Sequence, residues 1–475
     1  MTSQTPKVAL WWIRRDLRLA DNQALVEALN YAEVVIPVFI VDPILWASSK
    51  AGDKRKAFLL EGLRRLDESL HVRASALIVR IGNPIVELPK LVEETKASIV
   101  FAEEDYSPYA RRRDEEVSKQ ISLRLTPGLT IHHPAKVVKS DGTPYTIFTP
   151  FSKAWKSLPP PLSILPAPHR IPTPIGIPRD ELPPSPLPSL PGFPAGENEA
   201  QLRLGAFIRG TPPLVHDYHH HRDRPDLNAT SSLSPYIRFG MVSVRHVTLA
   251  ALKLMQRAPS TDARKGLETW LNEIIWREFF QAILFHFPHV HQRSFRDELQ
   301  NIPWHNDPDL FQAWCTGQTG YPIVDAAMRQ LIHSGWMHNR ARMIAASFLT
   351  KDLLIDWRWG EKWFMQHLID GDLAANNGGW QWSAGTGTDA HPYFRVFNPV
   401  LQGKKFDPHG NYVRQWVPEL RSLSAEDIHT PWEMPLDAQK RAGVLIGTHY
   451  PAPIIDHAWA RERALEAYGR AKNNH

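Results

Sequence analysis

The segment Gly335–Trp382 concentrates side chains that could hold a large polar ligand. It mixes tryptophans with amides, an arginine and carboxylates inside a helical pattern: Trp336, Asn339, Arg342, Trp357, Trp359, Trp363, Asp370, Asp372, Asn376, Asn377, Trp380 and Trp382. A buried charge must be paired, and a buried amide must find hydrogen-bond partners. Because ordinary helical cores carry few such groups, the pattern favours a large polar and aromatic ligand such as a flavin.

A second dense group runs from Trp270 to Trp276 (WLNEIIW). On a helix, Glu273 and Trp276 are three residues apart and share a face, which places a carboxylate beside an indole. Taken alone, the segment fits a helix that buries Trp270 and Ile274 and pairs Glu273 in a salt bridge. The first cluster, in the same predicted domain, strengthens the functional interpretation.

Three consecutive histidines, His219 to His221, could suggest a metal site. Three neighbours in a regular element cannot all face one ion, and no cysteine or carboxylate pattern accompanies them. The sequence therefore predicts no metal site.

Short apolar segments alternate with amphipathic helices in the first part of the chain. We expect strands at Val8–Ile13, Val34–Val41, Ala76–Ile81 and Ser98–Ala102, a weaker fifth at Thr130–His133, and helices at Lys54–Leu70 and Pro84–Thr95. This alternation is typical of a doubly wound parallel five-stranded sheet covered on both faces. Such sheets bind ligands beyond the carboxyl ends of their strands. No G-x-G-x-x-G motif follows the first strand, which disfavours an NAD-type site.

The segment Pro159–Pro194 holds 14 of the chain's 41 prolines, too many for a helix or a central strand. We expect a semi-rigid, extended connector there. Helical periodicity dominates afterwards, for example from Pro322 onward with apolar Ile323, Val324, Ala327, Met328 and Leu331. The predicted organisation is an α/β domain over residues 1–135, a proline-rich linker over 136–198 and a larger all-α domain over 199–475.

The composition is that of a globular protein of 475 residues with a net charge of +5, which is compatible with an acidic partner such as nucleic acid. Cys315 is the only cysteine, so no intrachain disulfide can form and a reducing compartment fits. The sequence shows neither a signal-peptide layout nor an apolar run that could span a bilayer. We expect a soluble, cytoplasmic monomer without membrane partners, or a nuclear one in a eukaryote.

Several long segments resemble the DNA photolyase/cryptochrome family, most closely the class I photolyases that repair cyclobutane pyrimidine dimers. In order along the chain they read WWIRRDLRLADNQAL, LNATSSLSPYIRFG, WLNEIIWREFF, TGYPIVDAAMRQL, GWMHNRARMIAASFLTKDLLIDWR and FMQHLIDGDLAANNGGWQWSAGTGTDAHPYFRVFNP. Together they span nearly the whole chain, and the proline-rich linker is the divergent part.

The resemblance implies one FAD per chain, held in the helical domain. The matching positions are Tyr218, Thr230, Ser231, Ser232 and Ser234 around the phosphates and ribitol, and Trp270, Asn339, Arg342, Asp370, Asp372 and Asn376 around the rest. Hydroxyls and backbone amides suit a pyrophosphate. A paired Arg342 and Asp370 suit a buried position, and the neutral amide of Asn376 suits flavin N5.

The implied reaction is the light-driven splitting of a pyrimidine dimer by an electron from excited FADH⁻. The dimer must first leave the duplex, and Trp276 and Trp382 match the residues that stack on the flipped bases. Glu273 would hydrogen-bond a base edge, Asn339 would contact dimer and flavin, and Met343 would line the pocket. A further match is the electron relay Trp380, Trp357 and Trp304, which runs from the flavin to the surface.

The implied partner is UV-damaged DNA, single- or double-stranded, bound through its phosphates rather than read base by base. Arg222, Arg340 and Arg395 match the positions that clamp the backbone beside the lesion. The α/β domain would hold a second, antenna chromophore near Arg55 and Asp105. We favour 8-hydroxy-5-deazaflavin over methenyltetrahydrofolate or FMN, because folate-binding relatives usually carry a glutamate motif where this chain has Ser107-Pro108-Tyr109.

The main alternative is a blue-light receptor on the same scaffold. Glu273, Trp276, Asn339 and Asn376 together favour repair instead. Repair of (6-4) lesions is disfavoured because that branch resembles a paired-histidine site where this chain has Met337-His338-Asn339. A flavoenzyme without photochemistry would need a base or nucleophile near the flavin, and none stands out.

Overall fold

The computed structural model describes residues 6–161, 163–188, 190, 192–390 and 392–473. Met1–Thr5 of the predicted first domain, and Leu162, Ser189 and Pro191 of the predicted linker, lie outside the described residues. The chain divides into two compact units, one formed by residues 1–219 and 231–288 and the other by residues 220–230 and 289–475. The predicted domain boundaries at residues 135 and 198 were placed by composition, whereas these units are defined by packing. The predicted boundaries therefore stay a prediction.

The first unit contains one parallel five-stranded sheet in the order β3-β2-β1-β4-β5. Its strands are β1 (Val8–Ile13), β2 (Val34–Val41), β3 (Ile78–Ile81), β4 (Ile99–Glu103) and β5 (Leu123–Thr126). The central strands β1 and β2 are almost wholly buried, as their unbroken apolar sequences predict. Strand order reverses between β1 and β4, the position where doubly wound sheets bind ligands. The predicted α/β sheet is confirmed.

The predicted position of the fifth strand is wrong. Strand β5 lies at Leu123–Thr126, and residues 130–133 form a bend. An edge strand with exposed side chains needs no continuous apolar run, so β5 lacked the expected signal. The backbone N–H groups of Ile131 and His132 donate to the carboxylate of Glu278 instead of to a neighbouring strand.

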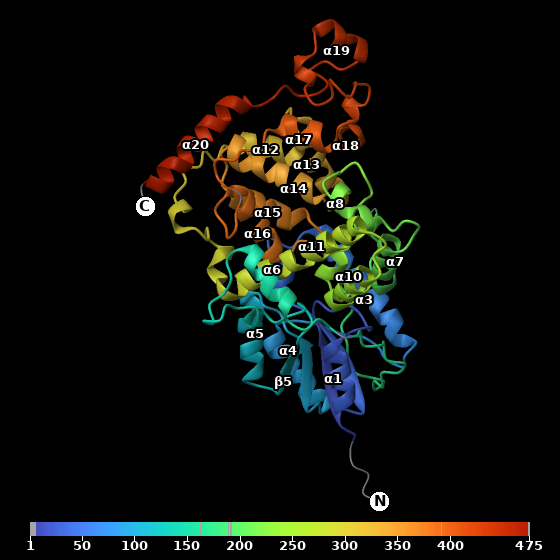
Figure 1. The fold of residues 1–475 in the computed structure, drawn as a ribbon. Coiled ribbons are helices and arrows are strands. Elements are labelled where there is room, and N and C mark those ends of the chain that lie inside the picture. Colours follow the sequence, from blue (N-terminus) through green and yellow to red (C-terminus); the bar gives the residue numbers. More distant parts are fainter. Residues whose placement is uncertain (1–5, 162, 189, 191, 391, 474–475) are drawn as a thin grey trace, which may run out of the picture. The chain divides into compact units, whose positions relative to one another are not determined.

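Helices of the first unit begin where a capping residue meets a good first turn. Asn83 and Ser107 cap helices whose first residue is proline, the preferred arrangement for a helix start. The helices are α1 (Gln23–Tyr31), α2 (Pro43–Trp46), α3 (Asp53–His71), α4 (Pro84–Thr95), α5 (Pro108–Ser118), α6 (Phe148–Ser157), α7 (Glu197–Ile208), α9 (Ser234–Arg238), α10 (Val244–Gln256) and α11 (Thr261–His286) (Figure 1). The short α8 (Tyr218–His221) crosses the boundary between the units.

The proline-rich segment contains no helix or strand among its described residues, as predicted. It is nevertheless bound to the sheet. Val35 donates to the carbonyl of Pro172 (3.0 Å), Ile171 donates to that of Arg73 (2.9 Å), and the Asp180 N–H donates to the carbonyl of Val79 (2.9 Å). The connector therefore lies along the β2–β3 side of the sheet and is fixed there by backbone hydrogen bonds.

The second unit is built from helices joined by loops. Its helices are α12 (Pro308–Thr316), α13 (Pro322–Ser334), α14 (Asn339–Ser347), α15 (Trp357–His367), α16 (Leu373–Ala384), α17 (Pro399–Phe406), α18 (Asn411–Trp416), α19 (Leu436–Ala442) and α20 (His457–Asn473), with a π-helical turn at Phe348–Asp352. Helix α13 begins at Pro322 as predicted, and its predicted apolar residues lie in the core of the unit. Every helix in the described part of the chain is too short or too polar to cross a bilayer.

Candidate functional site

Helix α14 presents three of the predicted site residues on one side. Asn339, Arg342 and Met343 follow each other at helical spacing, so their side chains are neighbours. The Asn339 amide contacts the Met343 sulfur at 3.7 Å. Asn339 is exposed at the first position of the helix, where a ligand can reach it.

Arg342 and Asp370 form the predicted ion pair. The guanidinium meets the Asp370 carboxylate at 2.8 Å, and its Nε donates to the carbonyl of Met337 at 2.8 Å. The Asp370 side chain is 3% exposed and that of Arg342 is 26% exposed. The pair is therefore buried on the carboxylate side and open on the arginine side, which fits a charged residue that also faces a bound molecule.

Helix α16 is positioned by Asp372, whose side chain caps it by accepting from the backbone N–H groups of Ala374 and Ala375. One turn further, the Asn376 amide nitrogen donates to the carbonyl of Glu361 at 3.0 Å. Because the nitrogen faces Glu361, the side-chain oxygen of Asn376 points away from Glu361. An amide held in this way can accept a hydrogen bond from the N5–H of a reduced flavin. The residues present therefore fit FAD.

In the first unit, two predicted cofactor residues pack on the same ring. Tyr218 meets Phe207 edge to face, with ring centroids 5.8 Å apart, and Trp270 meets Phe207 at 5.2 Å. Tyr218 is the first residue of α8 and lies before the boundary between the units, and Trp270 lies in α11. The fold thus joins two aromatic residues that are far apart in the sequence.

The predicted phosphate-binding loop has a backbone suited to an anion. Ser232 adopts a left-handed φ of 48° and Leu233 follows in the right-handed region. Such an alternation turns successive N–H groups toward one point and forms an anion-binding concavity. Ser231, Ser232 and Ser234 belong to the first unit, whereas Thr230 ends the short segment assigned to the second.

Helix α11 carries Trp270, Glu273 and Trp276 at intervals of three residues, which places them along one side of the helix. Glu273 and Trp276 are half-buried. The indole of Trp276 lies flat against Phe148 of α6, with ring centroids 3.7 Å apart and planes 3° apart. One face of this predicted base-stacking residue is therefore covered by the protein itself.

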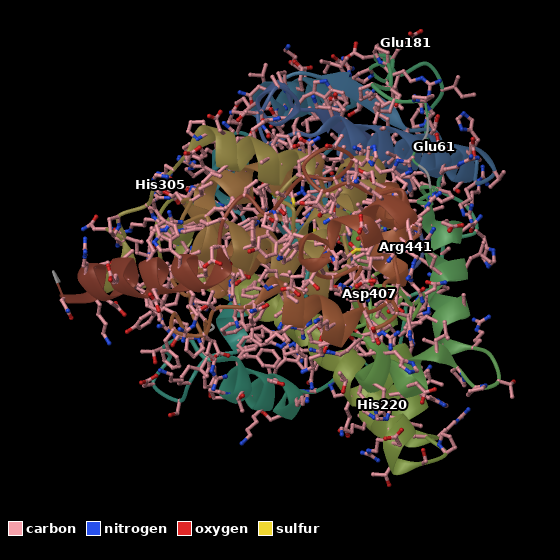
Figure 2. All side chains as sticks on the ribbon, turned by 90° about the horizontal axis from the view of Figure 1, so that it is seen from above. Glu61, Glu181, His220, His305, Asp407 and Arg441 are labelled. Carbon is pink, nitrogen blue, oxygen red and sulfur yellow. The ribbon has the colours of Figure 1, made fainter. Side chains whose placement is uncertain are left out.

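The three predicted relay tryptophans belong to one core in the second unit. Trp380 and Trp357 are buried there, and Trp304 is partly buried against the same cluster. His305, the next residue, has a side chain 50% exposed (Figure 2). Trp380 and Trp357 are thus equally buried and Trp304 is less so, and the relay stays a prediction. Trp382, two residues after Trp380 on α16, is half-buried.

The predicted DNA-binding arginines differ in their surroundings. Arg340 pairs with Asp223 at 2.9 Å and stacks on Phe406 at 4.3 Å, so its orientation is fixed. Arg222 approaches Asp223 at 3.9 Å. Arg395 is exposed, and no carboxylate among the described residues pairs with it. Asp223 thus holds two of the three guanidinium groups and neutralises part of their charge.

Of the two predicted antenna residues, one follows the carboxyl end of a strand and the other lies in a helix. Asp105 comes two residues after β4 and pairs with Arg15 at 3.3 Å, while Arg55 lies in the first turn of α3 and donates to the carbonyl of Lys50. Burial opposes ionisation of Asp105, but the charge of Arg15 and the N–H of Ser107 outweigh it and hold the pKa of Asp105 below its usual value. A fixed negative charge therefore lies at the edge of the sheet where the strand order reverses.

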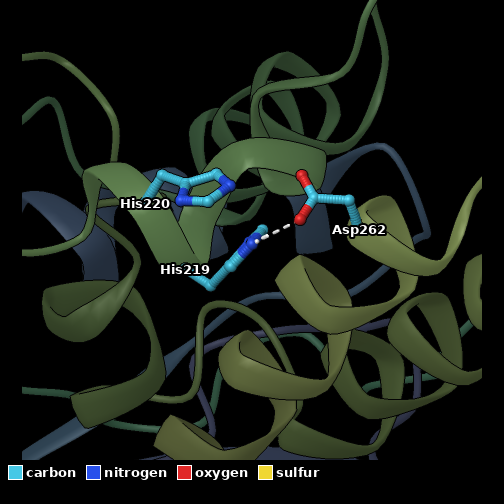
Figure 3. A group of neighbouring side chains, drawn as sticks. All are labelled: His219, His220 and Asp262. Carbon is cyan, nitrogen blue, oxygen red and sulfur yellow. Dashed lines mark hydrogen bonds and ion pairs between the residues drawn. The ribbon is translucent and has the colours of Figure 1, made fainter.

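Two of the three consecutive histidines, His219 and His220, lie with Asp262 in a group whose ligand atoms are within 4.8 Å of one another, so the predicted absence of a metal site stays a prediction. His219 forms a hydrogen bond with Asp262 at 3.0 Å (Figure 3), whereas His220 and His221 are exposed. The bond to Asp262 accounts for the inward position of His219.

Two residues near this site were missed by the sequence reasoning. Phe148 and Trp155 lie in α6, inside the region taken as linker, and they reach α11 through Trp276 and through Glu278. The available signal was the run FTPFSKAW, whose aromatic residues at 148, 151 and 155 follow helical spacing.

Comparison with known proteins identifies the family. The family model for DNA photolyase matches residues 9–172, and the model for the FAD binding domain of DNA photolyase matches residues 270–470. The deoxyribodipyrimidine photo-lyase of Agrobacterium fabrum is 40% identical over 487 residues, with 99% of each chain covered.

Two solved structures extend this likeness to the fold. A bacterial class III photolyase from Agrobacterium tumefaciens superimposes with a TM-score of 0.93 at 39% identity and 99% coverage of both chains. A cryptochrome from Synechocystis gives 0.89 at 31% identity and covers 98% of this chain and 100% of its own. Membership of class I stays a prediction, since the first of these structures is of a class III enzyme. The chain belongs to the DNA photolyase family, and its C-terminal part is the FAD-binding domain of that family.

Proposed function

We propose that this protein is a light-driven DNA repair enzyme, a lyase that splits cyclobutane pyrimidine dimers. The observation that carries the proposal is the similarity, at about 40% identity and over the full length, to proteins named deoxyribodipyrimidine photo-lyase. The pairing of Glu273 with Trp276 on one side of α11 supports the same substrate.

The protein's own groups have distinct tasks in this reaction. Bound FAD in its reduced form supplies the light-excited electron. Trp276 and Trp382 stack on the flipped bases, each contact contributing about 1–3 kcal/mol. Glu273 accepts a hydrogen bond from a base edge and holds the dimer in register. Asn339 and Met343 line the space beside the dimer.

The cofactor contacts follow the same proposal. Asn376 would accept from flavin N5 with its side-chain oxygen, because its amide nitrogen already donates to the carbonyl of Glu361. Arg342, Asp370 and Asp372 hold the polar edge of the ring system. Tyr218, Thr230, Ser231, Ser232 and Ser234 would hold the phosphates and ribitol, and Trp270 would lie against the rest of the cofactor.

For the antenna chromophore we propose 8-hydroxy-5-deazaflavin, held at the carboxyl edge of the sheet near Arg55 and Asp105. The ionised Asp105 and the buried Arg55 offer charged partners to its polar ring edge. Mass spectrometry of the chromophore released from protein made in a deazaflavin-producing host tests this proposal. Release of a folate or of FMN from such protein would contradict it.

The decisive experiment is repair of a UV-irradiated oligothymidylate by the pre-reduced protein, in near-ultraviolet light and in darkness. Intact thymines absorb ultraviolet light more strongly than their dimers, so repair restores the absorbance of the DNA. We expect recovery in light alone. Bound FAD without recovery would instead favour a blue-light receptor, the alternative that the likeness to the Synechocystis cryptochrome supports.

A further inference from the structure

The stack of Phe148 on Trp276 has an unusual geometry. The planes are 3° apart and the centroids are separated by 3.7 Å, which is closer than the about 4.5–7 Å that is usual for aromatic pairs. Aromatic pairs prefer offset or edge-to-face arrangements to a face-to-face sandwich. The surrounding elements, rather than the preference of the pair itself, must therefore hold the two rings in this position.

Helix α6 is fixed on α11 by contacts along its length. The Trp155 indole N–H donates to the buried Glu278 carboxylate at 2.6 Å, and Phe151 packs on Phe279 with ring centroids 5.2 Å apart. At the end of α6, Lys156 donates to the side-chain oxygen of Asn272 at 2.8 Å. These contacts bring the first residue of α6, Phe148, over the indole and keep it there.

The edges of the indole are also held. Phe279 meets Trp276 edge-on with centroids 5.6 Å apart and planes 83° apart, and Phe280 lies at 5.6 Å with planes 35° apart. A half-exposed tryptophan without such neighbours exchanges between rotamers, and fixing it on binding costs conformational entropy. Here the indole plane is set before any ligand arrives.

We propose that Phe148 is a positioning residue for lesion recognition: it fixes the plane of Trp276, so that a flipped-out pyrimidine meets a preoriented stacking surface. The inference rests on the stacking role of Trp276 in the proposed function. Because Phe148 covers one indole face, a base approaches from the side that Phe148 leaves uncovered. The side chain acts through Trp276 and does not itself touch the dimer.

The test compares Phe148→Leu, Phe148→Tyr and Trp276→Ala, with Ile147→Ala as the matched control. Ile147 precedes Phe148, and its side chain is 52% exposed. We expect Phe148→Leu to raise the dissociation constant for a dimer-containing oligonucleotide about three- to tenfold. Affinity for the undamaged oligonucleotide, FAD content and repair yield per absorbed photon at saturating substrate should stay unchanged. Phe148→Tyr should restore the affinity, and Ile147→Ala should leave it unchanged.

The double variant separates positioning from general damage to the fold. In a Trp276→Ala background, Phe148→Leu should have no further effect on lesion affinity, because the residue it orients is absent. An equal loss in both backgrounds would overturn the inference, and so would wild-type affinity in Phe148→Leu beside a weakened Trp276→Ala. Wild-type affinity in Trp276→Ala would instead refute the stacking role in the proposed function. If Phe148→Leu does not fold, Phe148→Met, which keeps the apolar volume without a flat ring, serves in the same comparison.

Discussion

At the scale of single residues, the pair Arg342–Asp370 is the clearest electrostatic feature of the predicted cofactor site. The Asp370 side chain is 3% exposed, so its charge depends on the guanidinium 2.8 Å away. Breaking a buried pair by removing one partner costs about 3–5 kcal/mol. Because Arg342 keeps 26% of its side-chain surface exposed, the lower end of that range applies.

We predict that Asp370→Asn weakens FAD retention. The visible absorbance of flavin relative to protein after gel filtration measures this loss. Arg470→Gln, which removes a pair whose side chains are 73% and 70% exposed, is the matched control and should keep its FAD. Full FAD content in Asp370→Asn would remove the carboxylate from the set of cofactor contacts.

Trp304 is the second residue whose role can be isolated. It is only partly buried at the margin of the core that contains Trp357 and Trp380. We predict that Trp304→Phe blocks the photoreduction of oxidised flavin while the pre-reduced protein still repairs dimers. Flavin absorbance under illumination and a repair assay give the two readouts. Loss of both activities would contradict the relay assignment.

At the scale of elements, the approach of α15 to α16 depends on a glycine. A Cβ at Gly360 would overlap the Trp380 ring and crowd Leu349. The absence of a side chain at this position is what allows the buried tryptophan to lie against α15. The helix pair therefore sets the position of Trp380, the first residue of the predicted relay.

We predict that Gly360→Ala lowers the free energy of unfolding by about 1–3 kcal/mol, the usual cost of overpacking, and slows flavin photoreduction. Urea unfolding and illumination kinetics measure the two effects. Gly469→Ala on α20 is the control, since a Cβ there meets open space, and it should stabilise the helix slightly. Similar behaviour of the two variants would show that close packing on Trp380 is not required.

The contact between α6 and α11 depends on pH through Glu278. Burial raises the pKa of Glu278 from 4.5 to about 7, although the Ile131 N–H and the Trp155 indole N–H favour the ionised form. The folded protein thus keeps a proton that the unfolded chain releases between these values. Because the native state binds more protons in this window, the contribution is fully present below about pH 4.5 and lost as the pH rises through about 7.

We predict that Glu278→Gln, which cannot ionise, removes this part of the pH dependence. The stability of the wild type relative to the variant should fall by up to about 3 kcal/mol between about pH 5 and about pH 8. Urea unfolding of both proteins at the two pH values measures the difference. A difference that does not change with pH would show that Glu278 is ionised throughout.

At the scale of the whole molecule, the net charge of +5 is modest. We therefore expect DNA affinity to depend on a few arginines that contact phosphates. Three phosphate contacts by Arg222, Arg340 and Arg395 predict a slope of about −3 for log affinity against log salt. Arg395→Gln should reduce the slope by about 1, and Arg470→Gln should not change it. Titration of a dimer-containing duplex at several salt concentrations measures the slope, and affinity independent of salt would refute the clamp.

Elements with strong local signals were predictable. Strands β1 and β2 and helix α4 have the predicted bounds, because long apolar runs and an Asn-Pro start leave little choice. The fifth strand was misplaced, since an edge strand with two exposed residues carries no such run. The linker predicted over residues 136–198 includes helix α6, a short helix with one proline, Pro150.

The sequence by itself determined the family and the α/β and helical parts, and it predicted the cofactor and lesion positions, because long local motifs carry this information. Only the tertiary structure decided which side chains hold those residues in place. Phe148 reaches Trp276 across 128 positions, as the difference between their numbers gives, and Glu278 meets Trp155 across 123. Pairings at such distances arise from helix packing and from the exclusion of water, and no local pattern encodes them.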